Sequence, residues 1–222
     1  MSIAAAVHDV RARIDAAARR AGRDPATVTL VAATKNVAPD RIAEVLAAGV
    51  PDVGENRAQE LLAKAPALTD RTPPPRWHFL GPLQRNKVRA LAPLITCWES
   101  LDRLALGNTI AQHAPGAHVL VEVNLAAEPQ KAGCPPGDTP ALVDALRARG
   151  LTVAGLMTIP PHGDDPHPWF ARLRDLALTV QAPELSMGMS DDFEAAVEEG
   201  ATLVRVGRAL FGQRPRSQAP QQ

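Results

Sequence analysis

Short apolar runs alternate with helical segments along most of the 222-residue chain. This order predicts an α/β fold in which parallel strands are joined and covered by helices. We expect strands at residues 29–35, 52–56, 77–81, 95–99, 118–124, 152–159, 184–188 and 203–207. Eight such units favour a single (β/α)8 barrel of the TIM type, which needs about 200 residues or more. An open, doubly wound sheet is the alternative, but the first strand–helix turn lacks the Gly-x-Gly-x-x-Gly of a dinucleotide fold.

An extra helix is expected before the first strand. Apolar residues recur there at steps of four, three and four, as on one face of an amphipathic helix: Ile3, Val7, Val10 and Ile14. No linker divides the chain, so we expect one domain over residues 1–214. The polar residues 215–222 are expected to form a disordered tail.

Charge and cysteine content narrow the classes of partner. The chain has 24 basic and 24 acidic side chains, so neither a phosphate backbone nor an anionic membrane surface would attract it overall. No apolar run approaches the roughly 20 residues of a membrane span. The two cysteines, Cys97 and Cys134, form no Cys-x-x-Cys motif and suit a reducing compartment. We therefore expect a cytoplasmic protein that binds neither nucleic acid nor membrane.

The first candidate for chemistry is Lys35, at the end of the first predicted strand. It shares strand parity with Val31 and Ala33, which places it on the inner face if that face lines the barrel. Active sites of such barrels lie at the C-terminal ends of the strands. A partly desolvated lysine there can attack a carbonyl and form a Schiff base, whereas a solvated lysine is the ordinary alternative.

The last two strand ends form the second candidate, a phosphate site. Ser190 opens a loop that leads into a helix, and Gly207 ends the last strand. Glycines allow backbone N–H groups to approach an anion, and a hydroxyl can also donate. Asp191 and Asp192 must then project away from the anion, and Ser190 or Asp191 is expected to cap the helix. An ordinary loop between strand and helix is the alternative.

Arg205 is the third candidate, because the alternation of the last strand directs it into the barrel. It either forms a structural ion pair with Glu122 or Glu55, or addresses a ring nitrogen or carboxylate of a ligand. His78 is expected to be an ordinary buried histidine. The remaining histidines match no strong ligand spacing, so we expect no metal site.

Two turn-rich loops, residues 126–138 and 160–168, follow the fifth and sixth strands. On a barrel both would overhang the mouth, so either could act as a lid.

Six segments together resemble the pyridoxal phosphate homeostasis protein family, the single-domain relative of the alanine racemase barrel. They are residues 33–35 (ATK), 53–56 (VGEN), 77–87 (WHFLGPLQRNK), 155–159 (GLMTI), 185–191 (LSMGMSD) and 205–212 (RVGRALFG). The match runs in consistent order from about residue 3 to residue 214, so the set is specific although each piece alone is not.

The resemblance implies that Lys35 holds pyridoxal 5′-phosphate (PLP) as a Schiff base. Arg205 would face the pyridine nitrogen and Asn56 would lie near the ring. By the same resemblance, the Ser190 side chain and the backbone of Gly207 and Arg208 would hold the phosphate.

The resemblance also implies a role in intracellular PLP (vitamin B6) homeostasis and in the balance of amino and keto acids. PLP is an electron sink chiefly when its ring nitrogen is protonated, and an arginine beside that nitrogen disfavours the proton. The chain contains no tyrosine to serve as a racemase base, and no second domain is expected. We therefore expect a carrier without catalytic residues.

Two other functions stay open. One is a PLP-dependent fold-type III racemase or decarboxylase of unknown substrate. The other is a cofactor-free aldolase in which Lys35 attacks a sugar phosphate. Possible partners are PLP-dependent apoenzymes, and the low aromatic content of 3% offers no interface anchor, which favours a monomer.

Overall fold

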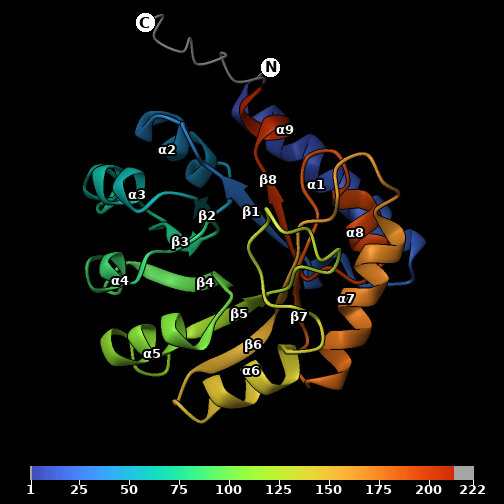
Figure 1. Cartoon of the computed structure of the whole chain (residues 1–222). Helices are drawn as coiled ribbons and strands as arrows, with labels where there is room; N and C mark the ends of the chain where they lie inside the picture. The colour runs from blue at the N-terminus through green and yellow to red at the C-terminus, as the bar shows by residue number, and fades with distance from the viewer. Residues whose placement is uncertain (1, 213–222) are drawn as a thin grey trace, which may run out of the picture.

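The computed structural model describes residues 2–212, which form a closed barrel of eight parallel strands (Figure 1). Each strand pairs with the next along the chain, and β8 closes the ring against β1. The strands are β1 (Thr29–Ala33), β2 (Asp52–Glu55), β3 (Arg76–Phe79), β4 (Ile95–Leu101), β5 (His118–Glu122), β6 (Thr152–Met157), β7 (Glu184–Ser186) and β8 (Leu203–Val206). The predicted barrel is confirmed and the open sheet is excluded.

Helices surround the barrel and connect successive strands (Figure 1). The α-helices are α1 (Ile3–Arg20), α2 (Pro39–Ala47), α3 (Ala58–Lys64), α4 (Arg85–Leu91), α5 (Leu104–His113), α6 (Thr139–Arg147), α7 (His167–Thr179), α8 (Phe193–Glu198) and α9 (Arg208–Phe211). Two 3-10 helices, η1 (Pro25–Thr27) and η2 (Ala65–Leu68), join them. No helix among residues 2–212 is long and apolar enough to cross a bilayer.

The predicted N-terminal helix is α1, which packs beside α8 and α9 on the outside of the barrel (Figure 1). Ser2 caps it, because its hydroxyl accepts a hydrogen bond from the Ala5 N–H at 3.3 Å. All four residues of the predicted apolar stripe are buried. Arg13 adds a two-pronged pair with Glu194 of α8, with N–O distances of 3.0 and 3.1 Å.

Two apolar layers result from the alternation of the strands. The larger layer lies between strands and helices and contains Val119, Val121 and Val204. The smaller one fills part of the barrel interior with Val31, Cys97, Leu120, Met157 and Leu203. The predicted inward side of β1, β5 and β8 is therefore confirmed. The rest of the interior holds polar side chains, which is unusual for a packed barrel and directs attention to them.

Some element ends differ from the prediction. The predicted first strand ran to Lys35, but β1 ends at Ala33, because Asn36 adopts a left-handed φ of +60° that turns the chain out of the sheet. Helix α8 begins at Phe193 with Asp192 as its N-cap residue, so neither Ser190 nor Asp191 caps it. The predicted tail, residues 215–222, lies outside the described residues, as do the last residues of the predicted domain.

Candidate functional site

A pocket of about 210 Å³ opens at the C-terminal mouth of the barrel. It brings together all six residues that sequence analysis assigned to a ligand, although they come from distant parts of the chain. The lining is Ala33, Lys35, Asn56, Leu80, Ile159, Met189, Ser190, Arg205, Gly207 and Arg208. The lining contains three cations and no carboxylate, which favours an anionic ligand.

Lys35 lies in the loop between β1 and α2, and hydrogen bonds hold this loop on both sides of it. The Thr34 hydroxyl donates to Glu55 Oε1 at 2.7 Å, and Lys64 Nζ donates to the Thr34 carbonyl oxygen at 2.9 Å. The Asn36 N–H donates to Glu60 Oε2 at 2.8 Å. Glu60 and Lys64 of α3 therefore fix the backbone on both sides of Lys35.

These supporting residues were missed by sequence analysis. Glu55 faces outward from β2 and contacts Lys64 Nζ at 2.6 Å, while Lys64 also contacts Glu60 at 3.1 Å. Burial raises the pKa of Glu55, although its hydrogen bonds with Lys64 and Thr34 oppose the shift. The predicted pairing of Glu55 with Arg205 is therefore wrong, because Glu55 lies on the other face of its strand. The spacing of Glu60 and Lys64, one helical turn apart, was the available signal.

The Lys35 amine itself is free of such contacts. Within residues 2–212 no carboxylate lies within 4 Å of it, and the side chain is half-buried at the pocket wall. A lysine without a counter-ion at a partly enclosed mouth is available to react with a carbonyl.

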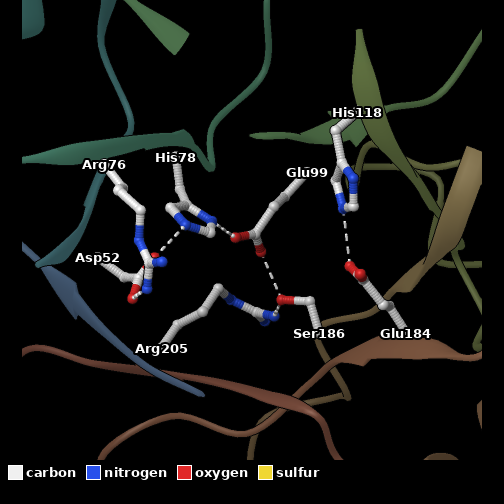
Figure 2. A network of polar contacts seen from close by, with 8 residues as sticks. All are labelled: Asp52, Arg76, His78, Glu99, His118, Glu184, Ser186 and Arg205. Atoms are coloured by element: carbon white, nitrogen blue, oxygen red, sulfur yellow. Dashed lines mark hydrogen bonds and ion pairs between the residues drawn. The ribbon is translucent and has the colours of Figure 1, made fainter. Parts of the chain in front are cut away.

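Arg205 enters the same pocket from β8 and is only 5% exposed. Its guanidinium donates to Ser186 Oγ at 2.5 Å and to the Thr158 carbonyl oxygen at 2.9 Å. The Ser186 hydroxyl in turn donates to Glu99 Oε2 at 2.5 Å (Figure 2). The predicted ion pair with Glu122 is not formed within 4 Å, although the charge of Glu122 opposes the lowering of the Arg205 pKa by burial. Arg205 is therefore oriented by neutral oxygens, with Glu99 one hydroxyl away.

The hydrogen-bonded chain continues toward the N-terminal mouth (Figure 2). His78 Nδ1 lies 2.5 Å from Glu99 Oε1, and His78 Nε2 lies 3.1 Å from Asp52 Oδ1. Burial alone would lower the pKa of His78, but hydrogen bonds with Asp52, Cys97 and Glu99 raise it to about 12. His78 is therefore a buried imidazolium between two carboxylates, which refines the predicted ordinary role.

The Glu122 carboxyl group near Arg205 is ionised less readily than an ordinary glutamate. Burial and the nearby Asp102 raise its pKa to about 7, while Arg205 opposes the shift. Glu99, whose pKa is lowered by His78, Arg205 and Ser186 against the effect of burial, is the anion that faces Arg205.

Ser190 and the start of α9 place hydrogen-bonding groups at one end of the pocket. The Ser190 Oγ accepts hydrogen bonds from the N–H groups of Gly207 and Ala209, each at 3.3 Å. These donors therefore converge where a phosphate oxygen could replace the hydroxyl. The Ala209 N–H, which sequence analysis did not name, is one of these two donors, and Arg208 between them lines the pocket. The preceding turn requires Gly188, whose φ is +91° and whose added Cβ would lie 2.5 Å from the Ala196 Cβ.

Each of the two aspartates after Ser190 has a partner that offsets its negative charge. Asp191 forms an ion pair with the Arg208 guanidinium at the surface, so its charge is balanced. Asp192 accepts a hydrogen bond from the Met189 N–H at 2.6 Å. Burial raises the pKa of Asp192, which further reduces repulsion of an anion.

The two predicted overhanging loops contact each other. Lys131 Nζ donates to the Pro160 carbonyl oxygen at 3.1 Å, and Asn124 holds the first loop through its contact with the Glu128 carbonyl oxygen at 2.9 Å. A lid role stays a prediction.

Outside the pocket, His78, Cys97 and Glu99 each have one potential metal-ligating atom, and these three atoms lie within 4.8 Å of one another. His78 and Glu99, however, are already hydrogen-bonded to each other deep in the barrel.

Comparisons with known proteins agree with this geometry. Residues 7–215 match the sequence model of the alanine racemase N-terminal domain family. The pyridoxal phosphate homeostasis protein of Pseudomonas aeruginosa is 44% identical, and the alignment covers 96% of each chain. That of Aquifex aeolicus is 43% identical, over 91% of this chain and 94% of the relative.

A solved structure shows the same likeness. PipY of Synechococcus elongatus, determined with PLP bound, is 36% identical and has a TM-score of 0.83. The alignment covers 95% of this chain and 100% of PipY. On the residues, the fold and these relatives, the chain belongs to the pyridoxal phosphate homeostasis protein family, within the alanine racemase N-terminal domain family.

Proposed function

We propose that this protein binds PLP reversibly at the C-terminal mouth of the barrel, as a Schiff base on Lys35, and takes part in intracellular PLP homeostasis. The observation that carries the proposal is a single pocket that contains an unpaired lysine amine, the Ser190 and Gly207 anion donors, and Arg205. The PLP-bound structure of PipY and the names of the curated relatives support the choice of ligand.

The donor set fits PLP chemically. An amine can hold an aldehyde, and a hydroxyl with converging N–H groups can hold a phosphate. The walls supply Leu80, Ile159 and Met189 as apolar surface for a ring. Ile159 and Met189 are 39% and 38% exposed, so both offer apolar surface that a ligand could cover.

We assign the roles of the site residues from the family resemblance and from their places in the pocket. Ser190 and the backbone of Gly207 and Arg208 would bind the phosphate, with the Ala209 N–H as a further donor, and Asn56 would border the ring. Arg205, held by Ser186 and Thr158, faces the ring nitrogen. Bound PLP supplies an aldehyde and an electron sink that is strongest when the ring nitrogen is protonated. A fixed guanidinium disfavours that proton, so the site holds the cofactor rather than activating it.

We therefore assign no catalytic residue and propose a carrier that affects the balance of amino and keto acids. The chain has no tyrosine to act as a second base for racemisation. We further propose that it works as a cytoplasmic monomer and that PLP-dependent apoenzymes receive its cofactor. Cys97 and Cys134 are both free thiols, as expected in a reducing compartment.

Absorbance and mass spectrometry test the binding. Purified protein incubated with PLP should show a visible band that borohydride removes, and the mass spectrum should place one pyridoxyl group on Lys35. Lys35→Ala should lose the band, whereas Lys131→Met, outside the pocket, should keep it. A colourless protein that rebinds no PLP would contradict the proposal and favour the aldolase alternative.

Proton exchange separates a carrier from an enzyme. The PLP-loaded protein should exchange amino-acid α-protons with heavy water no faster than free PLP does. Exchange at enzyme-like rates would replace the carrier with the racemase or decarboxylase alternative.

A further inference from the structure

A second pocket, of about 490 Å³, lies beside the lysine pocket on the same mouth of the barrel. It is formed by the segments that follow β2, β3 and β4, and its lining includes five residues of the WHFLGPLQRNK segment, of which the proposed function uses only Leu80. Its lining is Asn56, Arg57, Ala58, Gln59, Phe79, Pro82, Leu83, Gln84, Lys87 and Arg103. Asn56 lines both pockets, so the two sites are neighbours.

The charges of this second pocket are positive. Arg57, Lys87 and Arg103 line it, and no carboxylate does. Two of these cations have a carboxylate nearby that does not itself line the pocket. Glu60 lies 3.8 Å from Arg57, and Asp102 lies 2.5 Å from Arg103. Within residues 2–212 Lys87 has no carboxylate within 4 Å, so its charge has no partner. Because Arg57 and Arg103 each have a carboxylate within 4 Å, the local excess is the charge of Lys87, which a bound anion would balance.

The wall of the pocket is held in place by the backbone. An added Cβ at Gly81 would lie 2.3 Å from the Asn56 carbonyl oxygen, so the two loops pack directly against each other. The Ser100 hydroxyl donates to the Gly81 carbonyl oxygen at 2.6 Å, and Arg103 donates to the Leu83 carbonyl oxygen at 2.9 Å. The pocket is therefore preformed, which lowers the entropic cost of binding.

The two sides of the pocket differ in chemistry. Pro82 supplies exposed apolar surface next to the almost fully buried Phe79 and Leu83, whereas Lys87 and the amides of Asn56, Gln59 and Gln84 supply donors. A ligand with an apolar ring and an anionic group that has several acceptor oxygens matches both sides. A phosphate monoester offers three such oxygens to these donors, whereas a carboxylate offers two.

We propose that this pocket is a second binding site, for a small aromatic phosphate monoester, next to the site on Lys35. The choice of ligand rests on the proposed function, because a phosphorylated B6 vitamer has this chemistry. In this position the pocket holds a second phosphorylated molecule while Lys35 is occupied.

The test uses protein whose first site is blocked. PLP is fixed on Lys35 with borohydride, and the product is titrated with pyridoxine 5′-phosphate, which has no aldehyde, by calorimetry or equilibrium dialysis. We expect one further equivalent to bind. Loss of a charge-assisted hydrogen bond in Lys87→Gln should weaken this binding about tenfold or more. Arg89→Gln, on an exposed position of the same helix, should leave it unchanged.

Two further ligands define the chemistry of the site. Inorganic phosphate should compete but bind more weakly, and pyridoxine without its phosphate should bind too weakly to measure. The absence of a second equivalent overturns the proposal, as does an equivalent that Lys87→Gln leaves intact while its unfolding midpoint matches the wild type. Inorganic phosphate binding as tightly as the ester overturns the aromatic assignment.

The experiment separates this proposal from the proposed function. If borohydride places no pyridoxyl group on Lys35, the proposed function fails. The same titrations are then made on Lys35→Ala protein. Binding of one equivalent, weakened when Lys87→Gln is added, supports the second site.

Discussion

Both mouths of the barrel carry charged side chains, but the two mouths differ in how far these charges are paired. At the N-terminal mouth a pocket of about 510 Å³, larger than either pocket described above, is lined by Asp52, Arg76, His78, His118 and Glu184. Each of these charges has a partner there: Asp52 contacts Arg76 at 2.5 Å and His78 at 3.1 Å, and His118 contacts Glu184 at 2.8 Å. At the C-terminal mouth, Lys35 has no carboxylate partner within residues 2–212.

The comparison shows that the larger of the two pockets is the one whose charges are paired. The N-terminal pocket is large, but its paired charges serve the structure. The smaller C-terminal pocket keeps Lys35 without a counter-ion among residues 2–212, so a bound anion would supply the missing negative charge. Glu99 connects the two regions, because it accepts from Ser186 on one side and contacts His78 on the other.

The largest expected effect comes from Glu99→Ala. The substitution leaves the His78 imidazolium without one of its carboxylates and the Ser186 hydroxyl without its acceptor. Breaking one partner of a buried charged pair costs about 3–5 kcal/mol. We expect the free energy of unfolding in urea to fall by that amount and PLP affinity to fall as Arg205 loses its support.

Glu99→Gln is the matched control, because the amide keeps the shape and part of the hydrogen bonding. It should be more stable than Glu99→Ala. A loss below about 1 kcal/mol in the alanine variant would show that Glu99 behaves like a surface charge and that the two mouths are not connected through it.

The second largest effect is expected at the end of the C-terminal mouth where we propose that the phosphate binds. Ser190→Ala removes the hydroxyl that receives the N–H groups of Gly207 and Ala209. Loss of one hydrogen bond to a charged group should weaken PLP binding about tenfold, measured by the visible band. Pyridoxal, which has no phosphate, should bind both proteins equally. An equal loss for both ligands would mean that Ser190 supports the fold of the pocket instead.

Much of the C-terminal mouth could be predicted because it depends on local rules. The period of two along β1 and β8 places Val31 and Arg205 inside, and parallel strands bring their carboxyl ends to one mouth. Lys35, Ser190 and Gly207 were therefore placed together without knowledge of contacts between distant segments.

The partners of buried charges could not be predicted, because they depend on packing across the barrel. Glu99 and Ser186 are 87 positions apart in sequence, and the register between β4 and its neighbours shifts along the strand. Glu55 was expected near Arg205, but its strand parity with Val53 turns it outward toward Lys64. Ser190 was expected to cap α8, whereas its hydroxyl contacts the N–H groups at the start of α9.

A smaller, pH-dependent effect is expected at the N-terminal mouth. Contacts with Cys97 and then Glu184 raise the pKa of His118 from 6.5 to about 10, against the effect of burial. The protonated form is favoured in the folded protein, so its stabilisation is complete below pH 6.5 and is lost as the pH rises through 10. The pair is partly exposed, so screening limits the gain to about 1 kcal/mol or less.

Urea unfolding of wild type and His118→Gln at pH 6, 8 and 10 measures this contribution. The wild type should be the more stable protein at pH 6, and the difference should shrink by pH 10. A difference that stays constant with pH would mean that His118 contributes by packing, and the paired character of the N-terminal mouth would then rest on Asp52 and His78.

The smallest effect has the opposite sign and lies at the edge of the C-terminal mouth. Asp191 is exposed and pairs with Arg208, so it neutralises a cation beside the phosphate site. Asp191→Asn removes one negative charge and frees the guanidinium, and PLP affinity should rise about threefold at low salt. The gain should vanish at high salt, and Asp144→Asn on the exposed side of α6 should show none. A fall in affinity would instead mean that the Asp191–Arg208 pair holds the Gly207–Arg208 backbone in its binding position. The C-terminal mouth would then depend on a paired charge, as the N-terminal mouth does.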